Sequence, residues 1–124
     1  MKVIETTNAP GAIGPYSQGI VAGDFLFTSG QTPFDPVTGE TVPGGIKEQA
    51  ERVMQNLIAV VEEAGAAADK IVKTTCFLAD MADFAAFNEV YAKYIPSAPA
   101  RSCVAAKALP RGILCEVEAI VYLK

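Results

Sequence analysis

The most regular hydrophobic pattern in the chain lies between Ile46 and Ala64. Apolar residues recur there at the spacing of one helix face, while lysine, glutamate and arginine fill the other face. The apolar positions are Ile46, Ala50, Val53, Met54, Leu57, Ile58 and Val61. Gly65 follows directly and is a natural C-terminal cap. The pattern therefore predicts an amphipathic helix over residues 46–64.

A second helical pattern runs from about Met81 to Tyr94 and is stopped by Pro96. Its apolar face is largely aromatic. The residues on that face are Phe84, Phe87, Val90, Tyr91 and Tyr94. Aromatic residues at helical spacing are usually buried, so we interpret this face as part of the core.

The remaining apolar segments have the composition and alternation of strands. Ala22-Gly23-Asp24 has the chemistry of a hairpin turn, and Leu109 to Gly112 forms a second break. The long excursion from Gln31 to Gly45 is rich in proline and glycine, with a tight turn expected over residues 35–39. The predicted strands are Val3 to Thr7, Tyr16 to Val21, Phe25 to Ser29, Ile71 to Leu78, Arg101 to Ala108 and Leu114 to Leu123.

This order of elements predicts an α+β fold in which a mixed β-sheet carries both helices on one face. The 124 residues suit one domain, spanning residues 1–124. The other face of the sheet carries polar residues, so it either faces water or closes against other subunits. We favour closure.

Composition narrows the possible chemistry. The chain has no histidine, which removes the commonest general base and the commonest zinc ligand. The three cysteines, Cys76, Cys103 and Cys115, match no disulfide framework and no metal-binding spacing, so reduced thiols are expected. A net charge of −4 disfavours nucleic acid as a partner. The chain shows no signal peptide and no long apolar run, so we expect a cytoplasmic protein without membrane contact.

The last two predicted strands carry the candidate site residues. Alternation places Glu116 and Glu118 on one face of their strand, with Val117, Ala119 and Val121 on the helix side. In the preceding strand Arg101 and Cys103 share a face, and a four-residue turn at 109–112 would align them with the glutamates, leaving Val104 and Ala106 toward the helices. A register change of one residue would separate them. These residues also have structural interpretations. Arg101 and a glutamate could form an ordinary solvent-exposed ion pair, and Cys103 could be a small buried hydrophobic residue.

These residues lie within motifs that resemble the RidA (YjgF) family of enamine/imine deaminases. The likeness covers essentially the whole chain, and several separated motifs occur in the right order. The motifs are Asn8-Ala9-Pro10, Ile13-Gly14-Pro15-Tyr16-Ser17-Gln18-Gly19, Thr28-Ser29-Gly30-Gln31, Gln55-Asn56-Leu57, Ile71-Val72-Lys73-Thr74-Thr75, Asp83-Phe84, Asn88, Pro99-Ala100-Arg101-Ser102-Cys103-Val104, Leu109-Pro110 and Glu116-Val117-Glu118-Ala119-Ile120.

The resemblance implies a chorismate-mutase-like α+β fold and a homotrimer in which the sheets close into a central barrel, with substrate pockets between subunits. It implies hydrolysis of 2-imino acids such as 2-iminobutanoate and 2-iminopropanoate, with no metal or organic cofactor. One departure is the connection from Tyr94 to Pro99, which looks shorter than in the family and would alter the rim of the pocket.

The resemblance also implies a role for each matching residue. Arg101 would bind the substrate carboxylate, for which a bidentate guanidinium is well suited. Glu116 would position or activate water, Cys103 would contact the imine end, and Gly30 would contribute a backbone group. Further pocket-lining candidates are Tyr16, Ser29 and Asn88, each of which has an ordinary structural alternative.

Three other functions are compatible with the same resemblance. A non-catalytic binding, regulatory or chaperone-like module would not need both Arg101 and Glu116. A ribonuclease is disfavoured by the negative charge and the absence of histidine. Chorismate mutase activity needs several cations around a dicarboxylate, and the chain has only Arg52, Arg101 and Arg111.

Overall fold

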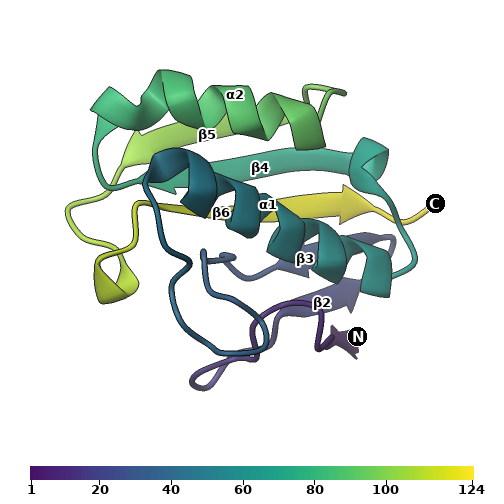
Figure 1. The fold of residues 1–124 in the computed structure, drawn as a ribbon. Coiled ribbons are helices and arrows are strands. Elements are labelled where there is room, and N and C mark those ends of the chain that lie inside the picture. The colour runs from purple at the N-terminus through teal and green to yellow at the C-terminus, as the bar shows by residue number, and fades with distance from the viewer.

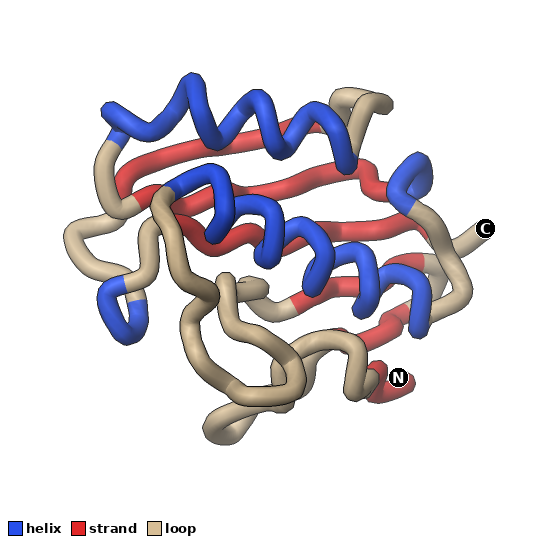
Figure 2. Tube along the Cα trace, in the orientation of Figure 1, coloured by secondary structure: helices blue, strands red, loops and turns tan.

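The computed structural model describes all 124 residues, which form one six-stranded mixed sheet with two helices on one face (Figures 1 and 2). The strands lie in the order β1-β2-β3-β6-β4-β5. The α+β prediction with both helices on one side is confirmed. The elements are β1 (Lys2–Ile4), β2 (Gly19–Ala22), β3 (Phe25–Thr28), α1 (Ile46–Glu63), β4 (Ile71–Leu78), α2 (Phe84–Tyr94), β5 (Ala100–Ala105) and β6 (Cys115–Tyr122).

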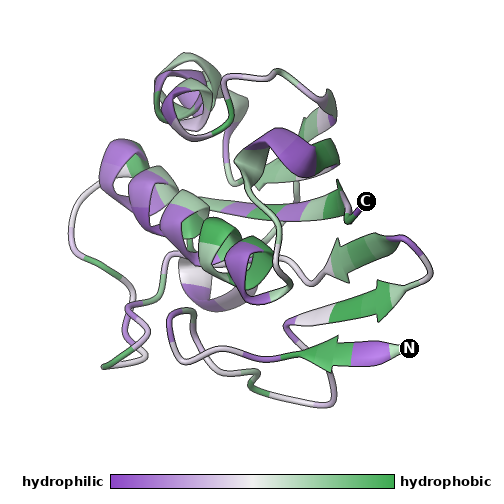
Figure 3. Cartoon of the chain, turned by 90° about the vertical axis from the view of Figure 1, so that its right-hand side faces the viewer, coloured by the Kyte–Doolittle hydropathy of each residue, from purple (hydrophilic) through white to green (hydrophobic).

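Helix α1 forms as the hydrophobic pattern predicts. At its start the Glu48 side chain turns back and accepts a hydrogen bond from the Gly45 N–H at 2.8 Å. At its end Gly65 has a φ of 89°, the left-handed conformation that a helix-terminating glycine supplies. Figure 3 shows hydrophilic residues gathered on the outer side of α1 and hydrophobic residues on its inner side. The apolar stripe packs on the sheet, and Val53, Met54 and Leu57 are fully buried.

The predicted hairpin between β2 and β3 is confirmed. Ala22 pairs with Phe25, so the turn consists of Gly23 and Asp24, and Gly23 has a φ of 60°. The tight turn in the long excursion is also present, because Asp35 Oδ1 accepts from the N–H groups of Val37 and Thr38. The two predicted N-terminal strands are shorter than expected, since β1 ends at Ile4 and β2 begins at Gly19.

The last two strands, β5 and β6, are not neighbours in the sheet. Strand β4 lies between β5 and β6, parallel to β5 and antiparallel to β6. Helix α2 is the crossover that carries the chain from β4 to the parallel strand β5, which is the geometry that a strand-helix-strand unit requires. The break at Pro110–Gly112 is a single 3-10 turn, but it connects strands that are not neighbours.

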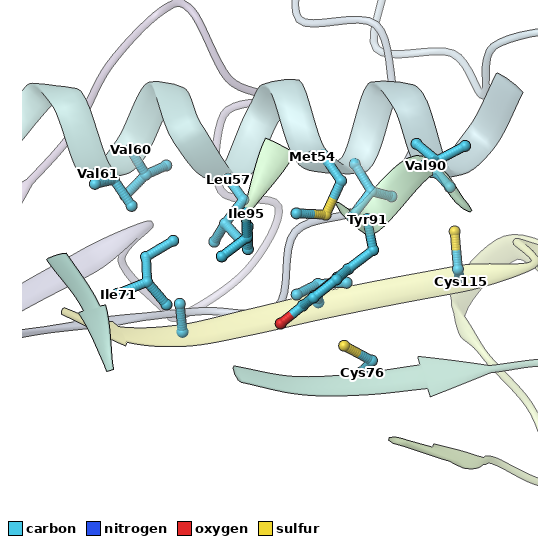
Figure 4. Packing of buried hydrophobic residues seen from close by; sticks show 14 of the residues in the cluster. Met54, Leu57, Val60, Val61, Ile71, Cys76, Val90, Tyr91, Ile95 and Cys115 are labelled. Atoms are coloured by element: carbon cyan, nitrogen blue, oxygen red, sulfur yellow. The ribbon is translucent and has the colours of Figure 1, made fainter. Parts of the chain in front are cut away.

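The core lies between the sheet and the two helices (Figure 4). Both helices and the strands β1, β3, β4 and β6 contribute buried residues to it, among them Phe87, Tyr91 and Ile95 from α2 and the chain that follows it. The aromatic face of α2 was therefore interpreted correctly for Phe87 and Tyr91. The opposite face of the sheet is uncovered and is not purely polar, since Phe27 and Val104 remain 45% and 48% exposed there.

Candidate functional site

A cleft of about 450 Å³ lies where three loops meet the start of β6. Four of the predicted site residues, Tyr16, Ser29, Gly30 and Glu116, line it together. The rest of the lining comes from the segments around them, namely Pro10, Gly11, Ile13, Gln18, Gln31, Thr32, Phe34, Pro110 and Arg111. The cleft is thus built from residues far apart in sequence.

The loop that carries Tyr16 is held by the buried carboxamide of Gln18. Its Oε1 accepts from the Thr6 N–H at 2.7 Å, and its Nε2 donates to the carbonyls of Thr6 at 3.0 Å and Pro10 at 2.8 Å. Ser29 Oγ donates to the Ser17 carbonyl at 2.6 Å, which ties the same loop to the end of β3. The Ser29 hydroxyl therefore has a structural partner as well as a place in the cleft.

Asn56 on α1 holds a second wall of the cleft. It is fully buried, and its Nδ2 donates to the carbonyls of Thr32 at 2.8 Å and Phe34 at 3.0 Å. Arg52 Nε donates to Asn56 Oδ1 at 3.0 Å, so both ends of the amide are satisfied. Sequence reasoning assigned Asn56 no role, although a polar residue beside the apolar stripe of a helix is the signal that would have found it.

Glu116 points into the cleft and packs against Gly30. A Cβ added at Gly30 would lie 2.1 Å from Glu116 Oε2, so only glycine leaves room for this carboxylate. Burial raises the pKa of Glu116 above its usual value, and the nearby Glu118 raises it further. A half-buried carboxylate with a raised pKa is a suitable general base or hydrogen-bond acceptor for water.

Arg111 is a cleft residue that sequence reasoning considered only as one of three arginines. Its guanidinium lies 4.3 Å above the centre of the Phe34 ring, and Nη1 donates to the Gly39 carbonyl at 3.0 Å. These contacts join the turn before β6 to the turn at residues 35–39. Arg111 adopts a φ of 56°, beside Gly112 in the same turn. It is a structural clamp between two walls of the cleft.

Arg101, Cys103 and Asn88 lie elsewhere, at the β5 edge of the sheet beneath α2. Arg101 Nη1 donates to Asn88 Oδ1 at 2.8 Å, and the guanidinium lies over the rings of Tyr91 and Phe84. No acidic side chain forms a salt bridge with Arg101. The alternative of an ordinary exposed ion pair is therefore wrong for this residue. Arg101 is an unpaired cation with most of its donors available.

Cys103 lies two residues further along β5 and pairs across the ladder with Cys76. It is half-buried against the core. Burial raises the pKa of the Cys103 thiol, while the positive charge of Arg101 acts in the opposite direction. Burial raises the pKa of Cys76 and Cys115 to about 12, so these two thiols stay protonated.

The predicted alignment of Arg101 and Cys103 with Glu116 is wrong within one chain. The ladder places Cys103, Cys76 and Val117 in one row on the helix side of the sheet. Val104, Phe77 and Glu116 form the neighbouring row on the uncovered side. Because β4 lies between β5 and β6, the length of the turn at residues 109–112 does not determine whether Arg101 and Glu116 share a face of the sheet. The expected inward placement of Val104 is also wrong, and Ala106 lies just beyond the end of β5.

The short connection after α2 does not reach the cleft. Ile95 is buried at its start, Ala98 has a φ of 53°, and Pro99 leads directly into β5. The connection is therefore next to Arg101 and not next to Glu116. Any effect on the rim of a pocket would be exerted on the Arg101 side.

The structure contains neither a metal-binding cluster nor a membrane-spanning helix. No group of three or more cysteine, aspartate or glutamate side chains is arranged to hold a metal ion. Neither α1 nor α2 has the length and apolar character needed to cross a membrane.

Comparison with known proteins shows the family. The Endoribonuclease L-PSP family model matches residues 6–123. A RutC family protein of Pyrococcus abyssi is 52% identical over 98% of this chain and 96% of its own length, and the 2-iminobutanoate/2-iminopropanoate deaminase of Mus musculus is 48% identical over 96% and 89%. The crystal structure of Escherichia coli TdcF with bound serine superposes with a TM-score of 0.95 at 44% identity, over all of both chains.

The chain therefore belongs to the Endoribonuclease L-PSP family. The resemblance to the RidA (YjgF) proteins is confirmed, and so is the fold that it implies for a single chain. Some members of the family carry deaminase names, and one has been crystallised with an amino acid.

Proposed function

We propose that this protein hydrolyses 2-imino acids to 2-keto acids and ammonia, with 2-iminopropanoate and 2-iminobutanoate as substrates. Water adds to the C=N carbon, the nitrogen is protonated, and the C–N bond breaks to release ammonia and leave a ketone. A protonated imine is already electrophilic, so the reaction mainly needs orientation, a base and a place for ammonia to leave. These demands are met without histidine or a redox group.

The observation that carries the proposal is the pair of half-sites. One half-site is an unpaired arginine, Arg101, held by Asn88 at 2.8 Å. The other is a half-buried carboxylate, Glu116, in a cleft of about 450 Å³. A cation for the substrate carboxylate and an acceptor for water are the two groups that the reaction requires.

The two half-sites belong to one pocket only if a second subunit supplies one of them. Within a chain they lie on opposite faces of the sheet, and β4 runs between their strands. We therefore propose a homotrimer whose uncovered sheet faces close into a barrel, with Arg101 of one subunit opposite Glu116 of the next. The exposed Phe27 and Val104 on that face support closure, because burying them in an assembly is favourable.

Each remaining site residue has a role in this pocket. Cys103 lies beside Arg101 and would contact the imine end with a protonated thiol. Gly30 would offer its backbone to the substrate, and its missing side chain leaves room for the Glu116 carboxylate. Tyr16, Ser29 and Asn88 would line the pocket, with Asn88 acting chiefly by holding Arg101.

The proposal is tested by generating 2-iminobutanoate and 2-iminopropanoate in situ with a dehydratase acting on threonine and serine, and trapping the imine with semicarbazide. The protein should suppress trapping by accelerating ketoacid formation, and Arg101→Ala should lose this effect. Lys107→Ala, which removes an exposed positive charge near the end of β5, is the matched control and should behave as wild type. Unchanged trapping by the folded wild-type protein would refute the deaminase function and favour a non-catalytic ligand-binding module.

A further inference from the structure

Arg101 rests on a platform formed by one stripe of α2. Phe84, Asn88 and Tyr91 are spaced four and three residues apart, so they project from the same side of the helix. The Arg101 guanidinium carbon lies 4.9 Å from the centre of the Tyr91 ring and 5.4 Å from that of Phe84. Both distances are within the range of a cation–π contact. Asn88 fixes one edge of the guanidinium, and the rings fix its plane.

Tyr91 is itself fixed by the strand that neighbours Arg101. Its hydroxyl is hydrogen-bonded to Thr74 Oγ1 at 2.7 Å, and Thr74 is fully buried. Thr74 is the ladder partner of Arg101 in the parallel pairing of β4 with β5. Thr74 therefore has two links to Arg101. It pairs with Arg101 across the sheet, and it anchors the Tyr91 ring on which the guanidinium lies.

This arrangement does more than fill the core. The long side chain of an arginine has a large rotamer entropy, which is lost when it binds a ligand in one geometry. A guanidinium that is already held flat by a ring and an amide loses less on binding. Nothing in the chain neutralises Arg101, so the platform holds the cation without occupying the donors that a carboxylate needs.

We propose that Tyr91, anchored by Thr74, is a positioning residue that pre-organises Arg101 for the substrate carboxylate. The inference rests on the proposed function, in that it assigns carboxylate binding to Arg101. It differs from a purely structural role because it predicts a loss of anion affinity that does not follow from a loss of stability.

The test measures binding of 2-oxobutanoate, a monocarboxylate with the shape of the product, by calorimetry or by NMR titration of the intact oligomer. Tyr91→Leu removes the ring and should weaken binding roughly tenfold. Tyr91→Phe and Thr74→Val keep the ring but break its anchor, and each should weaken binding by about two- to threefold. The double variant should be no weaker than either single variant, because both remove the same hydrogen bond.

Phe87→Leu is the matched control. Phe87 is a fully buried aromatic residue of the same helix whose ring lies 5.9 Å from that of Tyr91, but it makes no cation–π contact with Arg101. It should lower the melting temperature and leave the Kd for 2-oxobutanoate within about twofold of wild type. In turnover, Tyr91→Leu should raise KM while kcat changes little, as expected when an interaction with the carboxylate is lost from ground state and transition state alike.

Several results would overturn the inference. Equal weakening by Tyr91→Leu and Phe87→Leu would mean general loosening of the helix. If Tyr91→Leu does not fold, unchanged affinity in both Tyr91→Phe and Thr74→Val would refute the anchor. If Arg101→Ala binds 2-oxobutanoate as wild type does, Tyr91 has no carboxylate-binding cation to position. Failure of the deaminase function is distinguished separately, because trapping of the imine by semicarbazide would then be unchanged by the wild-type protein.

Discussion

Arg101 and Glu116 lie on opposite faces of one sheet, in strands that are separated by β4. Arg101 is on the helix side, in one row with Thr74 and Ala119. Glu116 is on the uncovered side, in the row with Phe77 and Val104. A pocket that uses both side chains must therefore take them from two copies of the chain.

Mixing two inactive variants tests this arrangement directly. Arg101→Ala and Glu116→Gln should each be inactive alone. When the two are unfolded together and reassembled at equal ratio, about a quarter of the interfaces combine an intact Arg101 with an intact Glu116, so about a quarter of wild-type activity should return. The readout is ketoacid formation after reassembly, compared with each variant reassembled by itself. No recovery in correctly sized oligomers would place the whole site within one subunit.

Gly30→Ala should reduce activity strongly while the protein remains folded. The added Cβ would lie 2.1 Å from Glu116 Oε2 and 2.7 Å from its Cδ, so the carboxylate must move. Gly11→Ala is the matched control, because it lies in the same cleft and its added Cβ meets no atom within 4 Å. We expect at least a tenfold loss of kcat for Gly30→Ala, since misplacing a catalytic group by about 1 Å costs rate on the order of 100-fold. Equal kinetics for the two variants would contradict a role for Glu116 in the reaction.

Glu116→Gln should alter both the pH profile and the stability. If ionised Glu116 positions water, the acid limb of kcat/KM in the wild-type protein should lie above the ordinary glutamate value of 4.5, because burial raises the pKa. A raised folded-state pKa means that stability is lost as pH rises from the unfolded value through the folded one. The glutamine variant cannot ionise, so it should be more stable than wild type at pH 7, and this advantage should shrink at pH 4.

The measurement is thermal or urea unfolding at both pH values. Glu62→Gln, at an exposed position of α1, controls for the loss of one negative charge. A variant at position 116 that is less stable than wild type at pH 7 would show that the carboxylate forms stabilising contacts in the assembled protein that outweigh its burial.

Asn56→Ala should destabilise the protein and loosen the cleft. It leaves the carbonyls of Thr32 and Phe34 without their donor, and each unsatisfied buried group costs about 1–3 kcal/mol. We expect a loss of about 2–3 kcal/mol in the free energy of unfolding, together with weaker substrate binding. Gln55→Ala, the exposed neighbour on the same helix, should change stability by less than about 0.5 kcal/mol. Denaturant unfolding of both variants gives the comparison.

The sequence predicted only some of the residues of the candidate site. The residues in motifs were found, whereas those that bind distant backbone carbonyls were not. Tyr16, Ser29, Gly30 and Glu116 were named from motifs and do share one cleft. The clamps Asn56 and Arg111 were missed, because their partners are backbone carbonyls 22 to 72 residues away in the chain. Hydrogen bonds between a side chain and a distant backbone leave no periodic signal.

The sequence by itself determined the local structure of the chain. The helix at Ile46–Glu63, its glycine cap, the β2–β3 hairpin and the turn at residues 35–39 follow from apolar spacing and turn chemistry, which act over a few residues. Alternation also decided correctly that Val117 and Glu116 face opposite ways.

Only the tertiary structure decided how those faces combine. Strand β4 pairs with both C-terminal strands, and α2 makes its pairing with β5 parallel, so the side on which Arg101 lies depends on a ladder with residues 27 positions earlier in the chain. Strand alternation gives two faces but not which face meets the helices, because that choice is made by packing the whole sheet against α1 and α2. The separation of Arg101 from Glu116, on which the proposed two-subunit pocket rests, is a consequence of strand order that local pattern does not contain.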